Sequence, residues 1–528
     1  MAETGAPATT SAIDSLGKGT VVIVLGTLAL FLLSFIGRIA VARHLSVEGF
    51  GDFNLGLALA GLLSLVALMG LHQATARTLA ATHDIASRRR VIRTTAVITA
   101  IASVVVSAVV YLLAAQISDL FDPAQSAQLT VVFHFFSVTV GLTLLCTFIA
   151  SVFQGFEDTV PYAWINQAVQ PAAFVIFVYI LFAYHLQLSA ALYAWVISNV
   201  VTFVALVIYA IPRLPKHLPP GPTAAELPSG MFLLSLSLWG VSTLTFVTAY
   251  VDTLILGAFR PEEQVGIYSA VMTLARLILI AAVAVTYIFL PVTARLNREG
   301  DFDTIRSSYV TTTRWAVLFA MPIFFVFAFL PSETLHSVFG KSYVPGSLAL
   351  VFVTAAGLIS IAFGPVNVTL AGMGQTRPLL LATGISAASN VILSFALIPT
   401  YGLIGAAIAW SVARMLYPAT GALALYTTHR IGPLHRTFVY PLVASLAVGV
   451  PLFLGVALLS PPDWVIYPLL VLGVAIFALS ILLTRSVERG DFVVIRIAEK
   501  LLKRPLPGLE HFLLRFTYDA PLPSTKVV

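Results

Sequence analysis

Three arginines lie more than two residues from either end of a long apolar run, where a positive charge is costly: Arg38, Arg276 and Arg414. Arg276 comes about ten residues into its run, so a helix carries it roughly 15 Å deep in a bilayer core about 30 Å thick. A charge at that depth usually faces a polar interior and serves a function. Because the planar guanidinium donates two parallel hydrogen bonds to a phosphate, these residues predict binding of an anionic, phosphate-bearing group.

Each of these cations has a structural alternative. Arg276 could belong to a structural ion pair, and Arg414 could have a partner within its own half of the chain. Arg38 lies near the end of its run and could reach the interface by snorkelling. Arg43 and Arg77 stand at the ends of the first two runs and are weaker candidates for the same site, because Arg77 could be a cytoplasmic anchor.

Acidic residues are scarce inside the apolar runs. We interpret Asp252, near the outer end of the seventh run, as a gating or ion-coupling group, and Asp52 as a weaker candidate for the same role. The alternative for Asp252 is an ion pair with Arg260 or Arg38.

The sequence gives little support for an enzyme. It contains no P-loop, no H-E-x-x-H and no G-x-S-x-G motif. Asp301-Phe302-Asp303 matches the D-x-D of some glycosyltransferases, but it lies in a short loop without a soluble domain around it. The single cysteine, Cys146, excludes an intramolecular disulfide and a cysteine-based metal site. We therefore expect no catalytic residues, no metal and no cofactor.

The composition is that of a membrane protein. The 528 residues are 59% hydrophobic and only 10% charged, whereas soluble domains carry about 25% charged residues. The mean hydropathy is +0.96. The net charge of +6 is explained by membrane orientation and anionic lipid headgroups, so we expect no nucleic-acid partner.

Apolar runs of membrane-spanning length recur along the chain and predict an all-α polytopic protein with about fourteen transmembrane helices. The runs cover residues 20–42, 54–75, 91–117, 129–153, 162–184, 190–211, 231–258, 266–293, 312–330, 347–371, 379–398, 404–426, 438–459 and 465–483. No cleavable signal peptide is expected, because the first run is long enough to span the membrane.

The segments between the runs suggest a domain organisation. The stretch 212–230 contains six prolines, beginning with Pro212, and we expect a non-helical linker there. Residues 487–503 alternate apolar and basic side chains and predict an amphipathic surface helix. The predicted parts are an N-terminal segment 1–17, a first lobe 18–211, the linker 212–230, a second lobe 231–428, a helix pair 429–485, and a terminal amphipathic helix and tail 486–528.

Basic residues concentrate in alternate loops, which predicts that both termini are cytoplasmic. These residues are Arg77, Arg88, Arg89, Arg90, Arg93, Arg213, Lys216, Arg295, Arg298, Arg306, Arg377, Arg430 and Arg436.

The two halves repeat one another at intervals of 215 to 218 residues. The matching stretches are 51–53 with 266–268, 75–77 with 293–295, 155–161 with 372–378, and 194–195 with 409–410. Each repeat holds six runs, an even number, so the lobes should be parallel and related by a pseudo-two-fold axis along the membrane normal. In transporters that are built from two such repeats, the substrate binds between the lobes.

The chain resembles the multidrug/oligosaccharidyl-lipid/polysaccharide (MOP) flippase superfamily, and within it the Wzx-like polysaccharide transporter branch. The residues that carry the resemblance are Asp252–Gly257, Val265–Ser269, Gly372–Thr376, Asn390 and Leu397–Ala407. The likeness covers about residues 15–485. These motifs are mainly glycines and helix ends, so they identify the fold better than the cargo.

The resemblance implies a two-lobed transporter that moves isoprenoid-linked (pyro)phosphoryl sugars from the cytoplasmic to the outer leaflet of the cell membrane. In the family, the first, second, seventh and eighth spans line the cavity. It also implies glycan polymerase or glycosyltransferase partners, contact with membrane lipids and a functional monomer. The alternatives are a lipid II-type flippase, which the extra helix pair resembles, and a MATE-like multidrug antiporter.

Overall fold

The computed structural model of this chain describes residues 26–121, 126–219, 221–222, 228, 230–459, 461–487 and 516. The predicted N-terminal segment 1–17 lies outside the described residues. So do the predicted amphipathic helix 487–503 and the tail, apart from Val487 and Phe516.

Twelve helices in the described part of the chain are long and apolar enough to cross a membrane. One of them, α15 (Thr376–His429), contains two of the predicted runs and is broken at Gly402. The eighth run falls in a further helix, α10 (Glu262–Glu299). The described residues of the fourteen predicted runs therefore lie mainly in helices, and the chain is an all-α polytopic membrane protein. Some runs continue across a helix break, as 54–75 does between α2 and α3.

The first of two compact units comprises residues 1–273 and 387–410. It includes the start of α10 and the middle of α15. Its other helices are Gly26–His44, α2 (Val47–Leu68), α3 (Leu71–Ala81), α4 (Ile85–Leu112), α5 (Ala114–Asp119), α6 (Ser126–Gly155), the π-helical segment Pro161–Val169, α7 (Gln170–Phe182), α8 (Gln187–His217) and α9 (Met231–Phe259).

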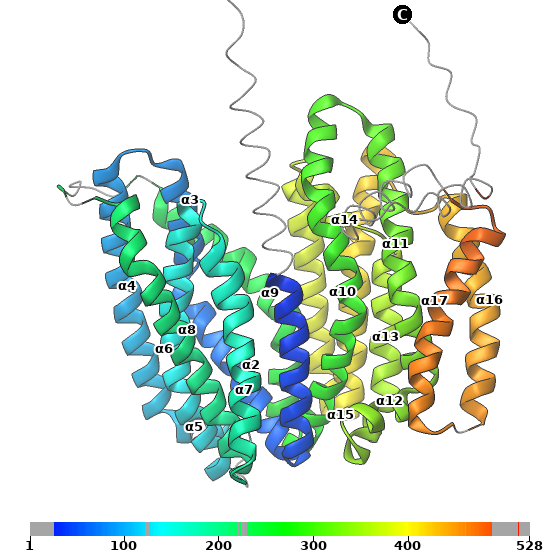
Figure 1. Ribbon diagram of the computed structural model, residues 1–528, viewed down its shortest axis with the longest axis horizontal. Helices are drawn as coiled ribbons and strands as arrows, with labels where there is room; N and C mark the ends of the chain where they lie inside the picture. The colour runs from blue at the N-terminus through cyan, green and yellow to red at the C-terminus, as the bar shows by residue number, and fades with distance from the viewer. Residues whose placement is uncertain are drawn as a thin grey trace, which may run out of the picture. The chain divides into compact units, whose positions relative to one another are not determined.

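The second unit comprises residues 274–386 and 411–528. Here α11, α16 and α17 pack against one another (Figure 1). Besides the remaining parts of α10 and α15, its helices are α11 (Phe302–Phe329), α12 (Pro331–Val338), the 3₁₀ turn Lys341–Gly346, α13 (Ser347–Ala362), α14 (Val366–Gly372), α16 (Arg436–Leu458), the 3₁₀ turn Asp463–Val465 and α17 (Ile466–Leu483).

The break in α15 is fixed by the turn between α9 and α10. Gly402 has φ 56° and ψ −131°, a backbone conformation that glycine adopts without a steric penalty. The Gln264 side-chain oxygen accepts a hydrogen bond from the Leu403 amide at 3.1 Å, and the Arg260 guanidinium donates to the Pro399 carbonyl. Arg260, at the end of α9, thus satisfies a carbonyl that ends the first half of α15. Gln264, in the first turn of α10, satisfies an amide that begins the second half.

A reciprocal helix crossing supports the predicted repeat. A side chain on Gly51 of α2 would overlap the Glu262 carbonyl of α10, and a side chain on Gly266 of α10 would overlap the Val47 carbonyl of α2. Gly51 and Gly266 are 215 positions apart, as are Val47 and Glu262. In each repeat, therefore, the glycine faces the carbonyl that lies four residues before the equivalent glycine of the other repeat.

A second pair of glycines makes equivalent contacts, one in each unit. A side chain on Gly155 would overlap the Ala76 carbonyl, and a Cβ on Gly372 would lie 3.0 Å from the Thr293 Cβ and 3.3 Å from the Ala294 amide. Ala76 and Ala294 are 218 positions apart, and the two glycines are 217 apart. The short motifs shared by the halves thus mark close helix contacts.

Aspartates begin equivalent helices in the two units. Asp84 caps α4 by accepting from the Ser87 amide at 2.8 Å, and Asp301, 217 positions later, caps α11 by accepting from the Thr304 amide at 3.0 Å. Hydrogen bonds from the Ser87 side chain and amide lower the pKa of Asp84 below its usual value, and those from Thr304 do the same for Asp301.

The linker prediction is wrong at its beginning. Helix α8 continues through Pro212 and Pro215 and ends only at His217. Each proline removes one hydrogen bond to a carbonyl one turn earlier. Both lie in the last two turns of the helix, at a polar end where water can satisfy those carbonyls.

Candidate functional site

Arg38 joins the first two helices of the first unit. It lies in the helix Gly26–His44, and its guanidinium donates a hydrogen bond of 2.7 Å to the side-chain oxygen of Asn54 in α2. Asn54 is buried, and its amide nitrogen donates to the Phe50 carbonyl at 2.8 Å. Arg38 therefore points toward protein rather than only toward the membrane interface, which argues against simple snorkelling.

Asp252 joins α9 to α10 in a similar way. Its carboxylate is fully buried and accepts a hydrogen bond of 2.5 Å from the Tyr268 hydroxyl and one of 2.8 Å from the Thr253 amide. The neighbouring Arg260, which was one predicted partner of Asp252, instead donates to the Ile398 and Pro399 carbonyls.

The two contacts lie one residue out of register in the repeat. Each joins residues 16 positions apart, but Arg38 precedes Asp252 by 214 positions, whereas Gly51 precedes Gly266 by 215. At the spacing of the glycines, Tyr268 corresponds to Phe53 and not to Asn54. One hairpin thus carries a cation, and the other an anion, within one residue of the equivalent position.

The remaining candidates of the first unit differ in burial. Asp52 is buried in α2, and its carboxylate accepts a hydrogen bond of 2.7 Å from the Gln128 amide of α6. Arg43 and Arg77 are exposed near the ends of their helices, which agrees with their lower rank as predicted site residues.

Arg276 lies in the part of α10 that belongs to the second unit. Its side chain is half-buried, and its neighbours Ala275 and Ile278 are fully buried. Helix α13 approaches α10 here, since a Cβ on Gly357 would lie 2.8 Å from an Ile278 methyl group. Arg276 comes 14 residues after the start of α10, or about 21 Å along it, far from either end of this 38-residue helix.

The sequence places this architecture in a family. The family model described as polysaccharide biosynthesis protein matches residues 16–297, more than half of the chain. The chain belongs to the polysaccharide biosynthesis protein family.

Known relatives of this polysaccharide biosynthesis protein are distant. The probable low-salt glycan biosynthesis flippase Agl15 of Haloferax volcanii is 24% identical over 161 residues, which is 30% of this chain. The match spans only 34% of the length of that relative.

Solved structures support the fold. The lipid II flippase MurJ in an inward closed conformation matches with a TM-score of 0.65 at 15% identity, over 87% of this chain and 98% of MurJ. An inward-facing MATE-family multidrug transporter of the MOP superfamily matches with a TM-score of 0.61 at 14% identity, over 77% of this chain and 98% of that structure. The chain therefore has the MOP transporter fold, as its motifs predict.

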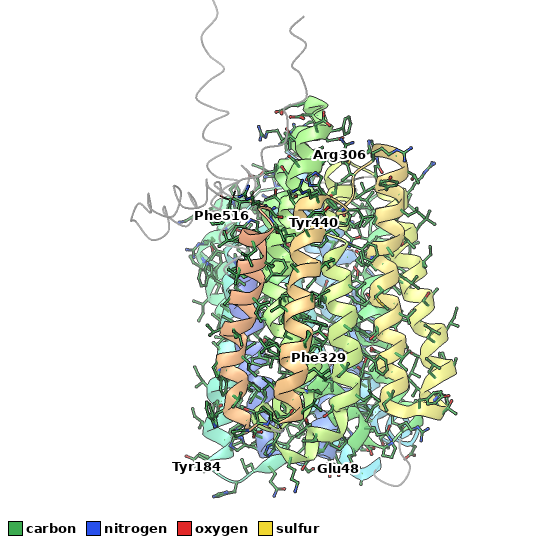
Figure 2. The ribbon with its side chains drawn as sticks, turned by 90° about the vertical axis from the view of Figure 1, so that its right-hand side faces the viewer. Glu48, Tyr184, Arg306, Phe329, Tyr440 and Phe516 are labelled. Atoms are coloured by element: carbon green, nitrogen blue, oxygen red, sulfur yellow. The ribbon has the colours of Figure 1, made fainter. Side chains whose placement is uncertain are left out.

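The D-x-D motif of this family member has structural roles. Asp301 caps α11, and Asp303 forms an ion pair with Arg306 at 3.0 Å. Arg306 also donates to the carbonyls of His429 and Arg430, which ties the start of α11 to the end of α15. Figure 2 labels Arg306 near one end of α11 and Phe329 farther along the same helix.

Sequence reasoning missed Arg314, a fully buried cation of α11. Its guanidinium donates to the carbonyls of Thr437, at the start of α16, and Ser486, just after α17. Arg314 therefore anchors both C-terminal helices to α11. Its place inside the ninth apolar run, two residues from the start, was a usable signal.

The candidate residues divide between the two units. Arg38, Arg43, Arg77, Asp52 and Asp252 belong to the first unit, and Arg276 and Arg414 belong to the second. Their convergence in one cationic cavity stays a prediction.

Proposed function

We propose that this polysaccharide biosynthesis protein is a flippase, not an enzyme. It moves an isoprenoid-linked (pyro)phosphoryl oligosaccharide from the cytoplasmic to the outer leaflet by alternating access, for surface polysaccharide or glycan assembly. One observation carries the proposal most strongly: long apolar runs of this chain hold arginines, among them Arg276, which lies far from either end of α10. A guanidinium held inside the membrane suits a phosphate headgroup.

Within this proposal the charged residues have distinct roles. Arg276 and Arg38 bind the phosphate groups of the cargo, with Arg414, Arg77 and Arg43 contributing to the same cationic path. Asp252 and Asp52 act as gating or ion-coupling groups. Their buried carboxylates each accept a hydrogen bond from a neighbouring helix, from Tyr268 and Gln128 respectively. Breaking that hydrogen bond would release the carboxylate for gating or ion coupling.

The proposal includes the cell membrane as the location, with both termini cytoplasmic and the protein acting as a monomer. The bias of basic residues toward one set of loops supports this orientation. Glycan polymerases or glycosyltransferases are the expected functional partners.

A deletion strain tests the function. Lipids extracted from cells without this protein should contain a lipid-linked oligosaccharide that disappears when the wild-type gene is returned, identified by mass spectrometry. Accumulation of lipid II would favour the cell-wall alternative. Loss of drug resistance without any lipid-linked intermediate would favour a multidrug antiporter. Either result would overturn the proposal.

A further inference from the structure

The second half of α15 holds a cation without a partner in the part of the chain that the structure describes. Ser411 and Arg414 are three residues apart and therefore lie on one face of the helix. The Ser411 hydroxyl and the Arg414 Nε are both buried, and neither has a hydrogen-bond partner. Both residues belong to the second unit.

The side chains of this unit that the structure places beside Arg414 are polar but uncharged. Its electrostatic neighbour is the phenol of Tyr417, which lies beside Thr383 on the first half of α15. The nearby Ser386 hydroxyl is already used, because it donates to the Ala413 carbonyl at 2.8 Å. No carboxylate forms an ion pair with Arg414 among the described residues.

Other arginines of the same unit are satisfied, which sets Arg414 apart. Arg314 is buried and donates to two backbone carbonyls, and Arg306 has both a carboxylate and two carbonyls. A guanidinium does not lose its proton to relieve the cost of burial. A buried charge without a partner costs several kcal/mol, so buried charges are normally paired.

We propose that Arg414 and Ser411 form a binding site for a small monovalent anion, such as chloride. The guanidinium supplies one positive charge, and the Ser411 hydroxyl supplies a further donor one turn away. One cation balances one negative charge, whereas a diphosphate carries at least two and needs more donors. The Arg414 side chain is half-buried, so its guanidinium is not completely enclosed by protein. An Arg414 that holds a small anion does not bind the cargo phosphate, so this site replaces its place in the cationic path proposed above. The rest of the flippase proposal does not depend on it.

The test measures the melting temperature of the purified full-length protein in detergent while chloride replaces gluconate at constant ionic strength. For the wild type, the melting temperature should rise with the logarithm of chloride concentration above the Kd. Arg414→Gln should abolish this rise and be more stable than the wild type without chloride. Ser411→Ala should weaken binding about tenfold. Arg377→Gln is the matched control, because Arg377 is an exposed arginine of the same helix, and should behave as the wild type.

Three results would overturn the site. They are a wild-type melting temperature indifferent to chloride, a chloride response that persists in Arg414→Gln, and a response only to a short-chain isoprenyl phosphate. If Arg414→Gln does not fold, the wild-type titration and Ser411→Ala decide instead. Bromide soaked into crystals should then give an anomalous peak beside Arg414, and its absence would contradict the proposal.

Discussion

The hairpin of helix Gly26–His44 with α2 and the hairpin of α9 with α10 are built alike but carry opposite charges. In the first of these, Arg38 donates to Asn54, and in the other, Asp252 accepts from Tyr268, each across 16 residues. The hairpins also meet through Gly51 and Gly266, whose contacts are reciprocal.

This difference in charge between the two hairpins shows which residues the fold requires and which it does not. The close crossing requires glycine in both hairpins, because any side chain there would overlap a backbone carbonyl. The hydrogen bond between paired helices requires a polar donor and acceptor but not a particular sign of charge. A cation at position 38 is therefore not required by the architecture, which supports a role for it in binding an anionic cargo.

The largest expected effect comes from the shared crossing. Gly51→Val and Gly266→Val should each prevent accumulation of folded protein, because the new side chain overlaps main-chain atoms that cannot move away cheaply. Membrane yield and size-exclusion profile measure the effect. A large difference between the two variants would break the equivalence of the hairpins. Gly240→Ala is a suitable control, since a Cβ there meets no atom within 4 Å.

Substitutions that remove each charge but keep its hydrogen bond should have different effects on transport in the two hairpins. Arg38→Gln can still donate to Asn54, but it should lower transport of the lipid-linked cargo about 10- to 100-fold through loss of a charged phosphate contact. Asp252→Asn can still accept from Tyr268. It should keep cargo binding and lose the response of transport to an imposed ion gradient. Flipping assays in liposomes with and without an ion gradient distinguish the two variants. Identical defects would contradict a cargo-binding role for Arg38 and an ion-coupling role for Asp252.

Removing the uncharged partner should affect the two hairpins equally. Tyr268→Phe leaves a buried carboxylate with one fewer donor, and Asn54→Ala removes the acceptor of the Arg38 guanidinium. Each should lower the free energy of unfolding by about 1–3 kcal/mol. Thermal unfolding of the purified variants measures this. No loss of stability in either variant would show that these contacts do not hold the hairpins together.

The smallest effect concerns the aspartate caps of α4 and α11. The folded-state pKa of Asp84 and of Asp301 is lowered, so each cap stabilises its helix fully above the unfolded pKa of about 4. This stabilisation is lost as the pH falls through the lower, folded-state value. Asp84→Asn and Asp301→Asn should therefore flatten the acid limb of the melting-temperature profile by similar small amounts. A flattening confined to one variant would show that the caps are not equivalent.

The apolar runs and the repeat were predictable because they depend on residue type. The described residues of the fourteen runs lie mainly in helices, and the repeated glycines mark close contacts. The 16-residue separation shared by Arg38–Asn54 and Asp252–Tyr268 was also present in the sequence.

Contacts to main-chain atoms were not predictable. Arg314 and Arg260 donate hydrogen bonds to backbone carbonyls. Every residue type has such a carbonyl, so the sequence does not show which one is bound. The end of α8 was misplaced because proline forbids one hydrogen bond but not the helix itself when it lies near a solvated end. The convergence of the arginines depends on how distant segments come together, which periodicity does not specify.

Reconstituted flipping by Arg276 variants tests the proposed role of an arginine within the membrane in binding an anionic lipid-linked glycan. Liposomes containing wild-type protein should move a lipid-linked oligosaccharide between leaflets. With Arg276→Ala at the same density in the liposomes, that activity should vanish, and Arg276→Lys should restore only part of it, because an ammonium lacks the bidentate geometry of guanidinium. Wild-type rates of flipping by Arg276→Ala would contradict the account.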